Sequence, residues 1–493
     1  MTKIVFLDII NASGGDSMKT AKEVESFLNK RPVKAFLRYL SKKDKNGKSL
    51  IYNVFDSYVD PHFPVGKKIL YAPFYLFVLF MRKKLNLSKE DFREKIVDMR
   101  PTVIAVNNLA RSVGHWGVTR PQNFYSPLLI VWNFTNGCNL KCKHCYQNAG
   151  TPWPDELTLQ EKLKAVDQMA EEDVPTLAIS GGEPYTSKDL FKVTRYAHDK
   201  GMHVSIATNG TFLSLPRLAE KTKEAGVNYV EISLDSVNPE VHDEFRGVKG
   251  AWEMTVKGIR NAVKVKGLQV GIATTATKYN VQEVEDLYKF SVDIGADKFF
   301  IFNFIPVGRG KEIIDMDPTP EDREKIMGIL YKHLTEGKID VFSTAPEFGM
   351  YCIRENPLGP VVTSHYSASS GKFARDGAEF IGGCGAGRAY FALQPNGDVT
   401  PCVFMPTLVV GNIRKTPLGK IWRDSKVLQD LRNRDKLEEN CKSCEFRAVC
   451  GGCRARAYAY YGDYLAPDPG CIYNKDYWDK LVESSKKEFA VHH

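Results

Sequence analysis

The fold of this chain is decided by the stretch LLIVWNFTNGCNLKCKHCY, which runs from Leu128 to Tyr146. Its first seven residues, Leu128–Phe134, are mostly apolar and predict a buried strand. Three cysteines follow in the spacing C-x3-C-x2-C: Cys138, Cys142 and Cys145. Four thiolates would complete a metal site, whereas three leave one coordination position free for another ligand. The thiols should lie on a loop at a strand end, where parallel sheets and barrels carry out chemistry.

This cysteine triplet resembles the signature of the radical S-adenosylmethionine (SAM) superfamily. The resemblance implies a catalytic role for the three cysteines, which would hold a [4Fe-4S] cluster whose fourth iron is chelated by SAM. It also implies the reaction. One electron cleaves SAM to methionine and a 5′-deoxyadenosyl radical, which removes a hydrogen atom from a substrate C–H bond. A partial zinc site is the alternative for an isolated triplet.

Strand-like and helical patterns alternate through residues 126–335. The strand-like runs are Leu128–Phe134, Thr176–Ser180, His203–Thr208, Tyr229–Asp235, Val270–Thr277 and Phe299–Pro306. Helical patterns such as Thr158–Glu172 and Leu215–Ala225 lie between them. Six β/α units predict an α/β fold with a parallel sheet and outer helices, which is a partial (β/α)6 radical SAM barrel by resemblance.

Several motifs at the predicted strand ends resemble the SAM-binding segments of the superfamily. They contribute Tyr146, Gly181, Gly182, Glu183, Thr208, Asn209, Ser233, Asp235, Arg246 and Ile305. Glycine permits close backbone approach, and the arginine fork suits a carboxylate. Alternatives remain open at three positions. Arg246 would pair with Asp243 or Glu244 at the surface, Tyr146 would pack in the core, and Ile305 would only end a strand.

Seven further cysteines follow residue 383, and their spacing resembles the SPASM extension of radical SAM enzymes. They are Cys384, Cys402, Cys441, Cys444, Cys450, Cys453 and Cys471. The resemblance implies one or two auxiliary iron–sulfur clusters. One would use Cys441, Cys444, Cys450 and Cys471. The other would use Cys384, Cys402 and Cys453, with Cys352, water or substrate as its fourth ligand. A pair of zinc sites is the alternative for this region, and a buried core thiol is the alternative for Cys352.

The run from Gly451 to Cys471 resembles the C-terminus of tetrapyrrole-tailoring members, including the haem-forming decarboxylase. The resemblance implies that Arg454 and Arg456 pair with propionates, with solvated arginines as the alternative. Val403 follows Cys402, where sulfatase-maturing relatives have an aspartate base, so that activity is not expected.

The patterns divide the chain into four parts. Residues 1–125 form a mainly helical region of unknown role, with a helical pattern over Lys19–Leu40. Residues 126–335 form the barrel, 336–383 a linker or covering loop rich in Gly, Ser and Pro, and 384–493 the SPASM domain. Ile69–Met81 is apolar, has basic flanks and is too short to span a bilayer. It is a buried core helix or an interfacial helix that touches a membrane.

The composition is that of a globular protein, and the close cysteine spacing without a secretory signal indicates metal binding in a reducing compartment. We therefore expect a cytoplasmic protein, with peripheral membrane contact through Ile69–Met81 as an option. The expected activity is oxidative modification of a tetrapyrrole precursor or a peptide, with ferredoxin or flavodoxin as electron donor. The alternatives are radical modification of a membrane lipid and a zinc-ribbon scaffold that binds nucleic acid through the net charge of +9.

Overall fold

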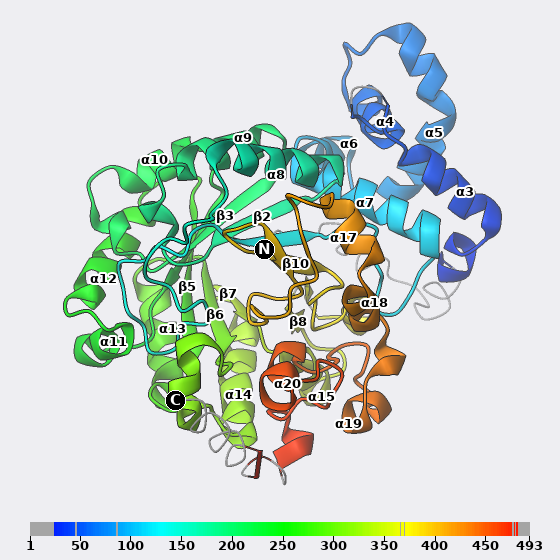
Figure 1. Cartoon of the computed structure of the whole chain (residues 1–493). Helices are drawn as coiled ribbons and strands as arrows, with labels where there is room; N and C mark the ends of the chain where they lie inside the picture. Colours follow the sequence, from blue (N-terminus) through cyan, green and yellow to red (C-terminus); the bar gives the residue numbers. More distant parts are fainter. Residues whose placement is uncertain are drawn as a thin grey trace.

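Ten strands form one sheet in the computed structural model, which describes residues 24–481 apart from 45–46, 85–86, 365, 369, 476–477 and 479. The order is β12-β11-β10-β1-β2-β3-β4-β5-β6-β7, and the run from β10 through β1 to β7 is parallel throughout. Strands β11 and β12 add to it in antiparallel fashion. The sheet curls into an open barrel with helices outside (Figure 1).

The six predicted strands are confirmed, with small shifts at their ends. They are β1 Leu129–Asn133, β2 Thr176–Ser180, β3 His203–Thr208, β4 Tyr229–Ser233, β5 Gln269–Ala276 and β6 Lys298–Asn303. The helices between and after them are α8 Leu159–Glu171, α9 Leu190–Asp199, α10 Leu218–Glu224, α11 Pro239–Arg246, α12 Ala251–Ala262, α13 Val284–Asp293 and α14 Pro320–Glu336. Helix α8 begins where Thr158 and Glu161 form a reciprocal capping box.

The N-terminal region is mainly helical, as predicted. Its helices are α3 Arg31–Leu40, α4 Leu50–Val59, α5 Val65–Lys84, α6 Lys89–Phe92 and α7 Arg100–Trp116, with a π-helical turn at Arg93–Val97. The start of the predicted Lys19–Leu40 helix lies outside the described residues. Helix α7 joins two cores, because Val103 packs with the N-terminal helices and Val113 packs with the barrel.

Regular structure occupies residues 336–383, where the sequence predicts a linker or covering loop. The elements are β7 Asp340–Ser343, α15 Glu347–Glu355, β8 Val361–Thr363, β9 Tyr366–Ala368 and α16 Lys372–Ile381. Strand β7 extends the barrel sheet beyond β6. The prediction of a linker is corrected here: each strand is short, and short strands flanked by Gly, Ser and Pro resemble loops in sequence.

The C-terminal region shares the barrel sheet. Its elements are β10 Tyr390–Leu393, β11 Asp398–Thr400, β12 Gly411–Asn412, α17 Leu418–Asp424, α18 Lys426–Arg432, α19 Glu439–Ser443 and α20 Arg454–Tyr461. Strand β10 pairs with β1 from Leu129↔Tyr390 to Trp132↔Leu393. Cys384 and Cys402, which flank β10 and β11 in the chain, are thereby placed near the strand that precedes the first three cysteines.

Candidate functional site

A cavity of about 330 Å³ lies inside the barrel and is lined mainly by alternate residues of β1 to β6. Alternation follows from strand geometry, since every second side chain points to the same face. Many of the lining side chains are small, among them Ala178, Ser205, Ala207 and Ala273. Barrels of this size are normally filled by their own side chains, so the small residues leave room for a ligand.

The three cysteines of the first motif line this cavity together. Each sulfur accepts a hydrogen bond, at 3.4 Å from the Leu140 N–H to Cys138, at 3.4 Å from the Ala149 N–H to Cys145, and at 3.8 Å from Arg246 Nη1 to Cys142. Burial raises the pKa of the Cys138 thiol to about 12, so its thiolate form needs the positive charge of a metal. The donor set therefore fits an iron–sulfur cluster.

No three His, Cys, Asp or Glu side chains among the described residues are close enough together to share one metal ion. In a [4Fe-4S] cluster the thiolates are distributed over the irons of the cluster.

The Gly-Gly turn after β2 packs directly on the loop that leads to the cysteines. Gly181 has φ of +122°, and a Cβ there would lie 2.6 Å from the Thr135 carbonyl oxygen. A Cβ on Gly182 would lie 2.2 Å from the Gly137 carbonyl oxygen. Only glycine fits at these positions, which hold the two loops in contact at the cavity wall.

Glu183 is fully buried and does not line the cavity. Its carboxylate accepts hydrogen bonds from Thr208 Oγ1 at 2.9 Å and from the Asn209 N–H at 2.8 Å. Asn209 in turn donates to Asn139 of the cysteine loop at 2.9 Å. We therefore revise its assignment: the carboxylate is turned away from the cavity and positions the residues that line it.

Asp235 and Arg246 form a buried ion pair, with Arg246 Nε 2.6 Å from Asp235 Oδ2. Arg246 lines the cavity and Asp235 lies behind it. Asp235 also accepts from the Thr275 N–H at 2.9 Å, so its carboxylate is directed at the protein and not at the cavity. The surface pairing of Arg246 with Asp243 or Glu244 is not found among the described contacts.

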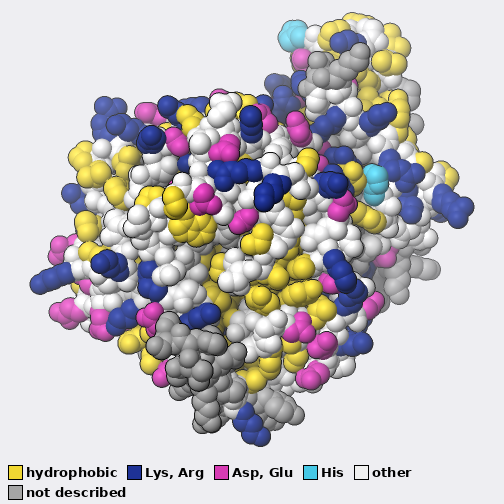
Figure 2. Space-filling view, in the orientation of Figure 1, with side chains coloured by type: hydrophobic (Ala, Val, Ile, Leu, Met, Phe, Trp, Pro, Cys, Tyr) yellow, Lys and Arg dark blue, Asp and Glu magenta, His cyan; other side chains and the backbone are white. Residues whose placement is uncertain are grey.

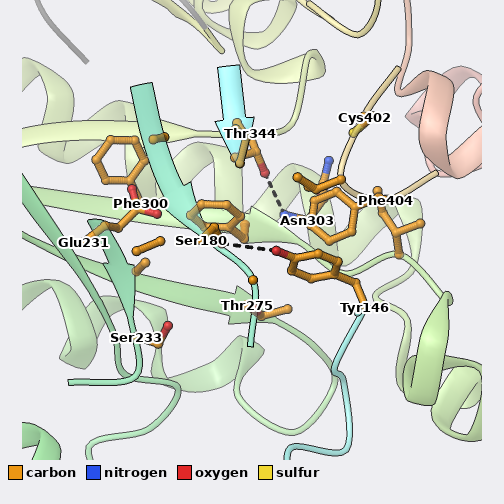
Figure 3. Close-up of a pocket in the computed structure, with 18 of the residues that line it drawn as sticks. Tyr146, Ser180, Glu231, Ser233, Thr275, Phe300, Asn303, Thr344, Cys402 and Phe404 are labelled. Carbon is orange, nitrogen blue, oxygen red and sulfur yellow. Dashed lines mark hydrogen bonds between the residues drawn. The ribbon is translucent and has the colours of Figure 1, made fainter. Parts of the chain in front are cut away.

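Ser233, Ile305 and Tyr146 line the cavity as well. The Tyr146 hydroxyl donates to Asn133 Oδ1 at 3.0 Å and is 3.2 Å from Ser180 Oγ. Figure 3 shows Tyr146 directed at Ser180, with Phe404 and Cys402 on the same side of the cavity. Tyr146 therefore links the cysteine loop to β1 and β2.

Several residues of the site escaped prediction from the sequence. Arg309 lines the cavity and donates to the carbonyl oxygens of Cys142 at 2.9 Å and Ala149 at 2.8 Å, so it holds the cysteine loop. Buried Gln147 and Gln394 share hydrogen bonds with Asn133 across β1 and β10. Gln147 directly follows the cysteine motif and Tyr146, so its position was an available signal. Gln394 and Arg309 stand in no motif, because their partners are distant in the chain.

Two groups of cysteines occupy the C-terminal region. Cys384, Cys402 and Cys453 line the same barrel cavity as the first motif, and the Tyr390 hydroxyl donates to Cys402 Sγ at 2.8 Å. Cys441, Cys444, Cys450 and Cys471 lie outside the cavity lining. Burial is the main cause that raises the pKa of Cys444, Cys450 and Cys471, and the Cys441 thiol raises each of them further. Cys384, Cys402 and Cys453 therefore share one cavity lining, and the division of the seven cysteines into two cluster-binding sets stays a prediction of the family resemblance.

Cys352 lies in α15, is fully buried in the main core and does not line the cavity. Of the alternatives for this residue, the structure supports a core thiol. The predictions for Arg454 and Arg456 are wrong, because both side chains are buried and bonded within the protein. Arg456 pairs with Asp468 and Glu347, and Arg454 donates to the Ala466 carbonyl oxygen at 2.7 Å.

Comparisons with known proteins agree with this geometry. A family model described as the radical SAM superfamily matches residues 132–291, and one described as an iron–sulfur cluster-binding domain, SPASM, matches residues 384–445. The AdoMet-dependent heme synthase of Methanosarcina barkeri is 37% identical over 71% of this chain and 97% of its own length. The mycofactocin maturase MftC of Mycolicibacterium smegmatis is 30% identical over 70% of this chain and 83% of its own.

Among solved structures, SuiB of Streptococcus suis bound to the precursor peptide SuiA has a TM-score of 0.62 at 16% identity. The match covers 86% of this chain and 93% of that chain. At this level of identity the match shows a shared fold.

Proposed function

This chain belongs to the radical SAM superfamily, in the branch with a SPASM domain, and we propose from this that it oxidatively modifies a tetrapyrrole precursor. The enzyme uses a [4Fe-4S] cluster with SAM, together with auxiliary iron–sulfur clusters. The chemistry that the bound cluster supplies is one-electron cleavage of SAM to methionine and a 5′-deoxyadenosyl radical. The zinc-ribbon scaffold is not retained, since the family is one of enzymes.

The observation that carries the proposal is that one cavity is lined by two cysteine sets. Cys138, Cys142 and Cys145 lie on it, and so do Cys384, Cys402 and Cys453. A substrate in this cavity is within reach of both sets, one for hydrogen abstraction and one for oxidation. The arrangement supports net oxidation, such as decarboxylation, in which a propionate loses one hydrogen atom, CO2 and one electron to become a vinyl group.

The chain's own residues bind, orient and enclose the reactants. We assign Thr208, Asn209, Ser233, Arg246 and Ile305 to SAM, with Arg246 on its carboxylate. Glu183 and Asp235 hold these groups in place, and the barrel wall orients the reactants toward each other. Aromatic side chains such as Phe300, Phe302 and Phe404 on the wall suit a planar macrocycle.

A peptide is the second candidate substrate, and it is favoured by the similarity to the mycofactocin maturase. One experiment distinguishes the tetrapyrrole from the peptide as substrate. Anaerobic, reconstituted enzyme is incubated with dithionite, SAM and an iron porphyrin that carries propionates. The masses of the products are then measured by mass spectrometry. We expect 5′-deoxyadenosine and loss of the elements of formic acid from the porphyrin.

The Cys142→Ser variant should form no 5′-deoxyadenosine, because it loses a ligand of the first cluster. The matched control is Cys352→Ala, which removes a thiol outside the cavity and should keep the activity. Turnover by Cys142→Ser refutes the assignment of the first cluster. Porphyrin left unchanged by an enzyme that cleaves SAM refutes the substrate and leaves a peptide as the candidate.

We further propose that ferredoxin or flavodoxin is the electron donor.

We also propose a peripheral membrane contact through Ile69–Met81, which makes a membrane lipid the third candidate substrate. Within the described residues, no helix is both long and apolar enough to cross a bilayer. Helix α5 projects away from the barrel, and apolar and basic side chains occur on this projecting end (Figures 1 and 2). Ile69 and Leu70 are 70% and 65% exposed. Flotation with anionic vesicles tests the contact, and protein that stays at the bottom of the gradient removes it.

A further inference from the structure

Buried arginines surround the cysteine loops of the SPASM domain. Arg388, Arg434 and Arg454 are 0%, 6% and 1% exposed. Among the described residues, no carboxylate lies close enough to form an ion pair with any of the three, whereas neighbouring Arg456 has both Asp468 and Glu347. A guanidinium removed from water costs several kcal/mol unless an anion offsets it. An anion other than a carboxylate beside these guanidiniums would offset this cost.

Arg434 lies where the two sets of SPASM cysteines meet. Its Nη2 donates to the Cys384 carbonyl oxygen at 2.9 Å, and its Nη1 donates to the Gly451 carbonyl oxygen at 3.4 Å. Cys384 belongs to the set on the cavity, and Gly451 follows Cys450 of the other set. The two sets are also joined directly, because the Cys384 N–H donates to the Cys450 carbonyl oxygen at 3.1 Å.

The loop that follows Cys450 packs directly against the guanidinium of Arg434. Gly451 has φ of +71°, and a Cβ there would lie 2.2 Å from Arg434 Nη1. The Nε of Arg434 is buried and has no hydrogen-bond partner among the described residues. The guanidinium therefore lies between the loop of Cys384 and the loop of Cys450, with one donor left for an anion held there.

We propose that Arg434 is a counter-cation shared by the two auxiliary clusters. It stabilises the reduced form of each, so that either cluster can hold the electron from the substrate radical. This proposal rests on the proposed function, since it needs both clusters. One electron enters one cluster and then leaves it for the other, and each transfer changes the charge of a cluster by one. A fixed cation between the two clusters favours both electron-rich states.

The test is a redox titration of the reconstituted enzyme followed by electron paramagnetic resonance. The Arg434→Gln variant removes the charge and should make reduction of the auxiliary clusters at least tenfold less favourable, a fall of about 59 mV for a one-electron couple. Arg434→Lys keeps the charge and should titrate close to the natural enzyme. The cluster on Cys138, Cys142 and Cys145 is the internal reference, and its potential should not change.

The matched control is Arg432→Gln. Arg432 is partly buried and stacks on the Trp422 ring at 4.3 Å, but it donates to the carbonyl oxygens of Gly387 and Trp422. This variant should leave all potentials unchanged. Unshifted potentials in fully loaded Arg434→Gln overturn the shared-cation role.

If Arg434→Gln does not retain its auxiliary clusters, the iron content of Arg434→Lys is measured instead. Retained clusters support the role of the charge, and loss in both variants overturns it. Failure of the natural enzyme to bind any auxiliary cluster is a separate result, which overturns the proposed function instead.

Discussion

Buried carboxylates of the barrel offset the cost of desolvation in different ways. Asp235 is ion-paired with Arg246, and Glu183 accepts hydrogen bonds from Thr208 and the Asn209 N–H. Glu231 of β4 points into the cavity (Figure 3), where the Tyr229 hydroxyl donates to it at 3.4 Å. Burial raises the pKa of Glu231 to about 7. An ionised Glu231 is therefore a cost to the fold, while a protonated one is a donor available to a ligand.

The Glu231→Gln variant should change how stability depends on pH. Below the ordinary pKa of 4.5 the carboxyl is protonated in both folded and unfolded states. Between pH 4.5 and about 7 the folded state holds the proton more tightly than the unfolded state, so the free energy of unfolding falls as the pH rises. The stability contributed by the protonated carboxyl is fully lost once the pH has risen through about 7. At pH 8 the glutamine variant should be more stable than the natural enzyme by on the order of 1–3 kcal/mol.

Anaerobic thermal melts at pH 6 and pH 8 measure this difference. The melting temperature of the natural enzyme should fall more steeply with rising pH than that of Glu231→Gln. Glu240→Gln, which changes an exposed residue of α11, serves as the control. Parallel pH profiles for the natural enzyme and Glu231→Gln would contradict the raised pKa.

At the scale of elements, α20 and α15 are joined by buried charge. Arg456 of α20 pairs with Glu347 at the start of α15 and donates to Asp468 at 2.7 Å and 2.9 Å. Asp468 also accepts from the Cys453 N–H at 2.6 Å. This network joins α15, α20 and the loop of Asp468, and it holds Cys453, a predicted cluster ligand, in place. The role of Arg456 is therefore structural.

Replacing Arg456 with methionine should destabilise the enzyme by about 3–5 kcal/mol, because two buried carboxylates lose their partner. The measurements are the yield of soluble protein and the anaerobic melting temperature. Adding Glu347→Gln to Arg456→Met should recover part of the loss, since one of the two unpaired charges is gone. Normal stability with a raised KM for porphyrin would instead restore the propionate-binding prediction.

At the scale of the whole molecule, the SPASM region completes the barrel sheet. Strand β10 covers the edge of β1, and buried Trp422 donates its indole N–H to the Phe124 carbonyl oxygen at 3.0 Å. Arg423 is 2.7 Å from Glu172 of the barrel. The two regions therefore share one sheet and one core, and the cavity wall needs both.

A chain that ends at residue 383 should aggregate, because Leu129–Trp132 would become an exposed apolar edge strand. Size-exclusion chromatography under anaerobic conditions is the measurement. The full chain with Cys441→Ser is the control, because it keeps β10 while it loses a predicted cluster ligand. A monodisperse truncated chain that still binds SAM would show that the barrel is independent of β10.

The sequence by itself determined the strands of the barrel, the first cysteine set and the strand-end motifs. These features are local, and parallel strands bring their carboxyl ends together at one edge, so a linear pattern suffices to predict the site. Tertiary structure alone decided that Arg454 and Arg456 are buried, that Cys352 lies in the core, that the carboxylates of Glu183 and Asp235 bond to the protein behind the cavity lining, and that β10 joins β1. Each of these depends on contacts between residues far apart in the chain, and no local periodicity encodes the partner of a buried charge.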